Sequence, residues 1–140
     1  MGELLMNFID KAFRNNLHGD DFLQAMANIY SEYEVREKLD EYPQFVKDVI
    51  SIIDYDTEIQ MEGLDSVIYG NLGEQLPEIL QALKNCGASH EVDVLCKAKA
   101  MPLEKYEKNY DALCNELAIR NDYDGFWNLV KNYINVSLQS

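Results

Sequence analysis

The most concentrated chemistry in this 140-residue chain is a run of carboxylates over residues 48–83. The run contains no Lys or Arg, so it carries eight of the negative charges in a chain whose formal net charge is -13. Its acids are Asp48, Asp54, Asp56, Glu58, Glu62, Asp65, Glu74 and Glu78. A dense group of carboxylates without bases is suited to binding a positively charged surface.

Four of these acids follow the spacing of one helix face. Residues three and four apart are neighbours on a helix, so the spacing i, i+4, i+8, i+11 aligns them in one stripe. The members of this stripe are Asp54, Glu58, Glu62 and Asp65. Apolar residues occupy the opposite side of the same segment, which predicts a helix that buries one face and exposes the acids to water. Asp56 falls beside the apolar side, and we expect it to be hydrogen-bonded or at the helix edge.

Other reactive residues do not form a recognisable centre. His90 lies between Cys86 and Cys96, but a zinc site needs four ligands and no fourth lies nearby. Cys114 is typical of a small core residue, and two histidines are few to activate a nucleophile. The sequence therefore predicts no metal, no cofactor and no catalytic residue, so we do not expect an enzyme.

The segments that position the acids have helical periodicity. No stretch alternates polar and apolar residues as a strand does, so we predict an all-α fold of six or seven helices, without a sheet, in one domain over residues 1–140. The acidic helix should begin near Pro43, run to about Met61 and kink at Gly63. The other predicted helices cover residues 4–13, 22–39, 77–86, 90–101, 103–119 and a final segment that starts at Asp122 or Asp124.

Composition restricts the setting in which such a chain acts. No apolar run reaches the length of about 18 residues that a transmembrane helix needs, and the first residues lack the basic flank of a signal peptide. Three cysteines are an odd number and agree with a reducing compartment, so we expect the cytoplasm. A pI of about 4.4 disfavours nucleic acid and anionic lipid as direct ligands, because both would be repelled. A basic protein is the complementary partner.

Residues 58–71 resemble the signature of a bacterial all-helical family, a domain of unknown function whose best-known member is the nineteen-kilodalton DNA mimic protein. That signature is a Glu-Val-Asn-Asn-Gly-Gly-Phe run followed by Gln, aromatic residues and Asn. The matching or similar positions here are Glu58, Ile59, Gly63, Leu64, Tyr69 and Asn71. The departures are Gln60, Met61 and Glu62, which replace both asparagines and the first glycine. The resemblance extends over residues 43–135.

The resemblance implies an acidic dimer that presents carboxylates where DNA presents phosphates, and so occupies a DNA-binding protein. Two alternatives fit the same charge. One is an immunity or antitoxin-like inhibitor of a basic toxin, and the other is a helical domain of unrelated function whose acids form a solvated face. The residues that we expect to bind a partner are Asp54, Glu58, Glu62, Asp65, Asp48, Glu74 and Glu78.

Overall fold

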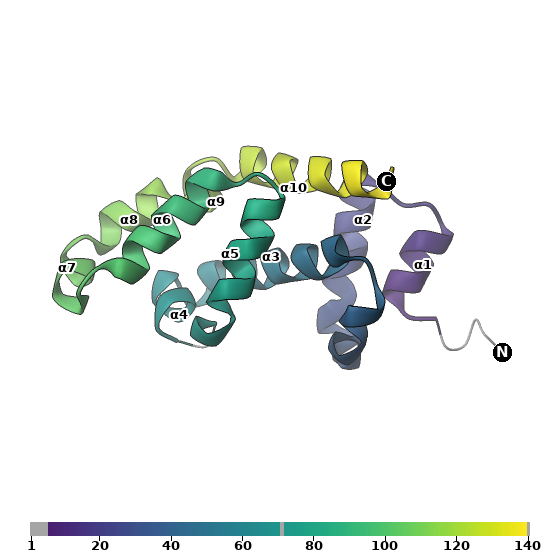
Figure 1. Ribbon diagram of the computed structural model, residues 1–140, viewed down its shortest axis with the longest axis horizontal. Helices are drawn as coiled ribbons and strands as arrows, with labels where there is room; N and C mark the ends of the chain where they lie inside the picture. Colours follow the sequence, from purple (N-terminus) through teal and green to yellow (C-terminus); the bar gives the residue numbers. More distant parts are fainter. Residues whose placement is uncertain (1–5, 71, 140) are drawn as a thin grey trace.

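The computed structural model describes residues 6–70 and 72–139, and these residues form helices but no strand (Figure 1). The α-helices are α1 (Phe8–Arg14), α2 (Gly19–Met26), α3 (Gln44–Met61), α4 (Leu64–Ile68), α5 (Leu76–Asn85), α6 (Ser89–Ala100), α7 (Leu103–Lys108), α8 (Tyr110–Glu116), α9 (Ala118–Asn121) and α10 (Tyr123–Leu138). Three 3-10 segments join them, η2 (Ala27–Tyr30), η3 (Tyr33–Glu41) and η4 (Gly73–Gln75). The all-α prediction is confirmed for the described residues.

The predicted number of six or seven helices is wrong, because two predicted helices are divided. The expected helix over 22–39 ends at Met26 and continues as η2 and η3. The expected helix over 103–119 breaks at Asn109 and again at Leu117, whose backbone is extended with φ -68° and ψ 126°. Leu117 is fully buried, so the apolar spacing continues across the break and conceals it in the sequence.

Helix α3 is the element around which the other helices pack. Its buried apolar residues contact α5, α2, α4 and α10, and Figure 1 shows it running lengthwise through the molecule with α10 along one edge. Helices α6, α7 and α8 extend to the end opposite α1 (Figure 1). The residues that α3 buries are Phe45, Val46, Asp48, Val49, Ile50, Ile52, Ile53, Tyr55 and Ile59. Asp48 is among them, so one of the acids that we expected to bind a partner lies in the core instead of at the surface.

The kink predicted at Gly63 is confirmed and amounts to a complete break. Gly63 has φ +87°, a left-handed conformation that favours glycine, and it separates α3 from α4. A Cβ at this position would lie 2.9 Å from the Tyr110 hydroxyl, so the backbone also approaches α8 closely. Asp65 therefore lies on a different helix from Asp54 and Glu58, and the predicted stripe does not run along one continuous helix.

Candidate acidic interaction surface

Asp48 is a buried acceptor and not a surface acid. It is 3 % exposed, and its carboxylate accepts hydrogen bonds from Gln44 Nε2 at 3.0 Å, Asn85 Nδ2 at 2.9 Å and the Tyr133 hydroxyl at 2.5 Å. These donors come from α3, α5 and α10, so Asp48 connects three helices. It is the least accessible of the acids expected to meet a partner.

Asp54 is occupied by an arginine from η3. The Arg36 guanidinium donates from both terminal nitrogens to the two carboxylate oxygens at 2.8 Å, and the Tyr30 hydroxyl donates at 2.5 Å. The guanidinium carbon lies 4.7 Å from the ring centroid of Tyr33. Side-chain exposure is only 25 % for Arg36 and 20 % for Asp54. The sequence suggested an acid without a compensating base, whereas the fold supplies one from 18 residues upstream.

Glu58 is half-buried and holds the start of the next helix. Its carboxylate accepts a hydrogen bond at 2.5 Å from the hydroxyl of Ser66, a buried residue of α4. Because Glu58 is on α3, this bond joins the two helices across the Gly63 break. One carboxylate oxygen of Glu58 is thus committed to the fold.

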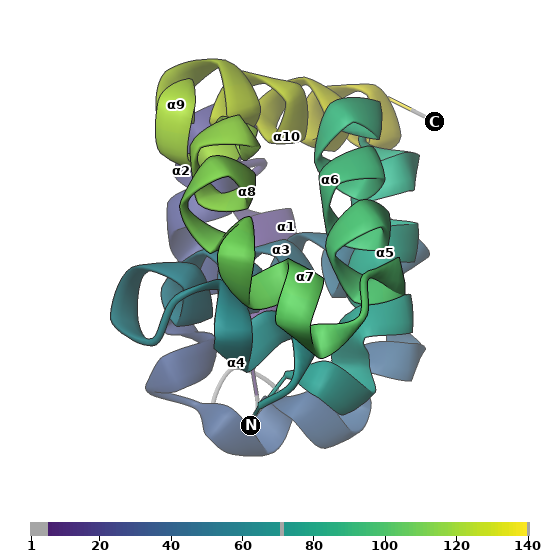
Figure 2. The same ribbon diagram turned by 90° about the vertical axis from the view of Figure 1, so that its left-hand side faces the viewer.

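Glu62 and Asp65 remain exposed, and Asp65 lies beside acids from α7 and α8. Asp65 lines a shallow cavity of about 290 Å³ together with Glu107 and Asp111, and its carboxylate accepts from the Tyr106 hydroxyl at 2.6 Å. Glu62 directly precedes Gly63, where an added Cβ would lie 2.9 Å from the hydroxyl of Tyr110, a residue that also lines this cavity. We define Glu62, Asp65, Glu107 and Asp111 as the acidic end. Figure 2 views the molecule from this end, with α4, α7 and α8 toward the reader.

The charge of the acidic end is not cancelled within the described part of the chain. None of its four carboxylates takes part in an ion pair there. Lys108 is the base that lines the cavity, and its ammonium lies 3.5 Å from Glu104 instead. Glu107 and Asp111 were not among the acids predicted to bind, because their segment also contains lysines and therefore lacks a conspicuous charge run.

The remaining predicted acids lie on η4 and α5. Glu74 and Glu78 are both exposed, and Glu78 lines a small cavity of about 100 Å³ with Asp54, Arg36 and Lys47. Two bases and two acids balance the charge of that cavity. Glu74 and Glu78 are thus accessible but lie apart from the cavity of the acidic end.

Many of the carboxylates accept a hydrogen bond from a tyrosine hydroxyl within the fold. Asp56 accepts from Tyr123 at 3.1 Å and from Gln60 at 3.3 Å, which confirms that it is hydrogen-bonded. The complete set of tyrosine–carboxylate pairs in the described residues is Tyr42–Asp10, Tyr133–Asp48, Tyr30–Asp54, Tyr123–Asp56, Tyr106–Asp65 and Tyr55–Glu91. Burial together with the neighbouring carboxylate raises the pKa of Tyr30 to about 12. These phenols stay protonated as donors at neutral pH.

The comparison with protein families agrees with the expected resemblance. A family model described as DMP19-like protein matches residues 40–134, which is more than half of the chain. The chain belongs to the DMP19-like family. No curated protein and no solved structure matches this chain significantly.

Within this DMP19-like chain, Glu91 is a carboxylate that the sequence reasoning missed. It is 1 % exposed and accepts from the Tyr55 hydroxyl at 2.8 Å and from the backbone N–H groups of Ala118 at 2.6 Å and Ile119 at 3.2 Å. It therefore caps the first turn of α9 from a distant helix. Burial raises the pKa of Glu91, while these three donors favour the ionised form and oppose that rise.

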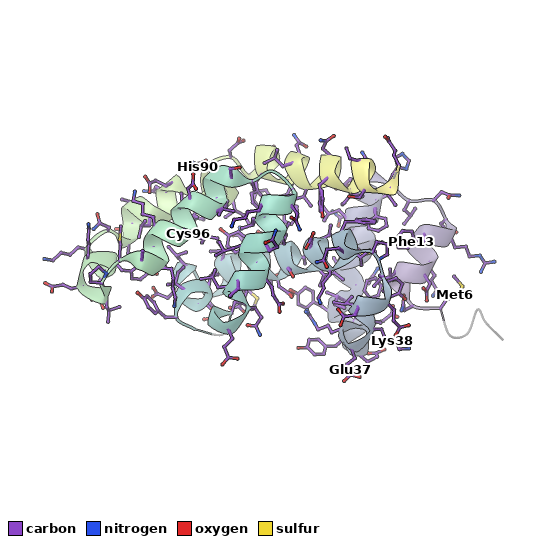
Figure 3. The ribbon with its side chains drawn as sticks, in the orientation of Figure 1. Met6, Phe13, Glu37, Lys38, His90 and Cys96 are labelled. Atoms are coloured by element: carbon purple, nitrogen blue, oxygen red, sulfur yellow. The ribbon has the colours of Figure 1, made fainter. Side chains whose placement is uncertain are left out.

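The cysteines and histidines of this DMP19-like chain form no common site in the described residues, and Cys114 lies beside Tyr110 at the cavity of the acidic end. Cys86 and Cys114 are buried and Cys96 is exposed, and His90 and Cys96 sit at separate points along α6 (Figure 3). His90 Nε2 lies 2.7 Å from the carbonyl oxygen of Glu116. No group of three potential metal ligands occurs among the described residues. None of the helices in those residues has the length and apolar character needed to cross a bilayer.

Proposed function

We propose that this chain is an acidic protein-binding module that occupies a basic, nucleic-acid-binding protein, and that the acidic end is its contact surface. Membership of the DMP19-like family supports the decoy role, in which carboxylates replace the phosphates of DNA. The choice of this contact surface is supported by one observation. Its acids are exposed and form no ion pair in the described part of the chain: Glu62, Asp65, Glu107 and Asp111.

The fold sorts the acids into two groups with different capacity for a partner. Asp48, Asp54 and Glu91 have their oxygens directed to internal donors, so a partner would have to displace bonds of 2.5–3.2 Å to reach them. Removing one member of a buried charged pair leaves the other unpaired at a large cost. The acidic end has acceptor capacity toward solvent, and accessible charges of one sign accelerate association with an oppositely charged surface.

The spacing of acids at the end of α3 is compatible with phosphate mimicry. Glu58 and Glu62 are four residues apart, which corresponds to a rise of about 6 Å along a helix. Successive phosphates of one DNA strand rise about 3.4 Å along the axis, so the two separations are of the same order. Gly63 then redirects the chain and places Asp65 on α4, which spreads the acids over a surface in place of a line.

The test is a variant in which the four acids of the acidic end become their amides: Glu62→Gln, Asp65→Asn, Glu107→Gln and Asp111→Asn. Its matched control removes four exposed acids from α2 and η3: Asp21→Asn, Glu34→Gln, Glu37→Gln and Glu41→Gln. Figure 3 shows Glu37 far from α7, so both variants change the net charge equally at different places.

Immobilised parent protein should retain basic DNA-binding proteins from a lysate at about 0.1 M salt and release them at about 1 M, because the Debye length falls from about 10 Å to about 3 Å. Duplex DNA should compete for the same proteins, which separates a decoy from an inhibitor of a toxin that does not bind DNA. The acidic-end variant should lose retention while the control keeps it. Equal retention by both variants would refute the assignment of this surface.

A further inference from the structure

Another cavity, of about 420 Å³, lies where α2, η2, α3 and α10 meet. Helices α2, α3 and α10 contact one another, and Figure 1 shows α2 beneath the C-terminal half of α10. Its volume falls in the lower part of the range of about 300–1,000 Å³ that ligand sites occupy. None of the acids of the acidic end lines it, so it is a separate feature.

The lining combines carboxylates with aromatic rings. Asp20, Asp56 and Asp124 contribute three negative charges, and Lys131 contributes one positive charge. The aromatic wall comes from Tyr30, Tyr123 and Trp127, and the last two rings meet edge-on with centroids 6.2 Å apart. Aromatic faces attract organic cations, and nearby carboxylates strengthen that attraction.

The carboxylates of this cavity still have acceptor capacity. Asp20 makes only long contacts, to Lys131 Nζ at 3.3 Å and to Gln24 Nε2 at 3.4 Å. Asp124 is exposed and has neither a side-chain hydrogen bond nor an ion pair in the described residues. Lys131 shows that a cation is already accommodated on one flank, although it neutralises only one of the three acids.

The chain itself shows how such a lining binds a guanidinium. Arg36 donates to both oxygens of Asp54 at 2.8 Å, and its guanidinium lies over the rings of Tyr33 at 4.7 Å and Tyr30 at 5.7 Å. The cavity offers the same two elements, a carboxylate beside a phenol ring, without an arginine among its lining residues. A planar guanidinium uses both elements at once, whereas an ammonium lacks the bidentate geometry.

We propose that this cavity binds the guanidinium of an arginine side chain. Its three carboxylates favour a cation, and the aromatic wall beside them favours a planar guanidinium over an ammonium. The indole N–H of Trp127 interacts with the Tyr123 phenol within that wall.

Trp127 is the only tryptophan of the chain, so its fluorescence reports directly on the cavity. The probes are acetyl-Gly-Arg-Gly-amide, its citrulline counterpart, which keeps the shape and lacks the charge, its lysine counterpart, and propylguanidine, which carries the guanidinium without a backbone or a second charge. The arginine peptide should bind at least about tenfold more tightly than the citrulline peptide, because a bidentate charged pair is lost. The lysine peptide should bind more weakly than the arginine peptide, and propylguanidine should bind measurably, because the guanidinium is the group that the cavity recognises.

Two variants test the assignment in opposite directions. Asp124→Asn should weaken binding of the arginine peptide by up to about fivefold, the effect of one exposed ion pair. Lys131→Met should strengthen it, because it frees Asp20 and removes a competing cation, and misfolding cannot produce that gain. Glu37→Gln, distant in Figure 3, is the control and should leave binding unchanged.

Equal affinity for arginine and citrulline peptides would overturn the proposal, as would weaker binding by the Lys131→Met variant. Propylguanidine without measurable binding would overturn the assignment of the cavity to the guanidinium itself. Because the probes are defined peptides, these results do not depend on the acidic end or on which proteins it retains from a lysate.

Discussion

Replacing Asp54 by Asn should destabilise the protein even though it removes a negative charge from an acidic chain. The pair with Arg36 is bidentate at 2.8 Å, and both side chains are about three-quarters or more buried. Exposed ion pairs contribute about 0.2–1 kcal/mol, and breaking a fully buried pair costs about 3–5 kcal/mol. The intermediate burial of this pair, together with the Tyr30 bond, gives about 2 kcal/mol.

Thermal and urea unfolding measure this loss. For a chain of this size, about 2 kcal/mol corresponds to a decrease in Tm of about 5–8 °C. Glu62→Gln is the matched control, because Glu62 is exposed and has no ion pair in the described residues. It also removes a negative charge four residues from Glu58, so its stability should stay equal or rise by about 0.2–0.5 kcal/mol.

A double-mutant cycle with Arg36→Met separates the pair from other effects of the substitution. We expect a coupling energy of at least about 1 kcal/mol between positions 36 and 54. An Asp54→Asn variant with the Tm of the parent protein would refute this reasoning and would return Asp54 to the group of acids available for a partner.

Three further predictions follow from the same geometry. Gly63→Ala should destabilise by more than the ~1 kcal/mol of a simple propensity change, because it forces a side chain into φ +87° and places a Cβ 2.9 Å from the Tyr110 hydroxyl; urea denaturation checks this, and an unchanged midpoint contradicts it. Glu91→Ala should cost about 3–5 kcal/mol by leaving the Tyr55 hydroxyl and two backbone N–H groups of α9 without an acceptor, which differential scanning calorimetry would show as a large loss of Tm. The pKa of Tyr30 is raised to about 12 by burial and by Asp54, so its contribution to stability is complete below about pH 10 and is lost as pH rises toward 12; ultraviolet titration of the phenols should show Asp54→Asn lowering that pKa, and an unchanged titration would contradict the role of Asp54.

The sequence predicted the helical class and a kink at Gly63 because both depend on local chemistry. Apolar spacing defines a helix face, and a glycine between two helical segments permits a left-handed backbone. The Arg36–Asp54 pair could not be read in the same way, since it joins a 3-10 segment to a helix through the tertiary fold. The number of acids in the sequence therefore overestimates the number of carboxylates that face solvent.

Two buried acids did carry a signal in the sequence that charge counting concealed. Asp48 lies three residues after Phe45 and four before Ile52, which are both buried. Glu91 lies three, four and seven residues before Val94, Leu95 and Ala98, which are also buried. An acid in the middle of an apolar face is expected to have dedicated donors. Their identity, Tyr133 for one and Tyr55 for the other, depends on chain packing that spacing does not reveal.

The pairing of six tyrosine hydroxyls with carboxylates has a consequence for how relatives of this protein should diverge. An acid that receives a phenol is retained for folding, so it should persist, and change together with its tyrosine, even in lineages whose binding partner has changed. Asp65 receives the Tyr106 phenol and also belongs to the acidic end, so both roles constrain it. Glu62, Glu107 and Asp111 accept no tyrosine hydroxyl in the described residues, so these positions can change when the binding partner changes. Overall acidity is then a poor marker of which relatives share a target, and the acids without a tyrosine are the positions to compare.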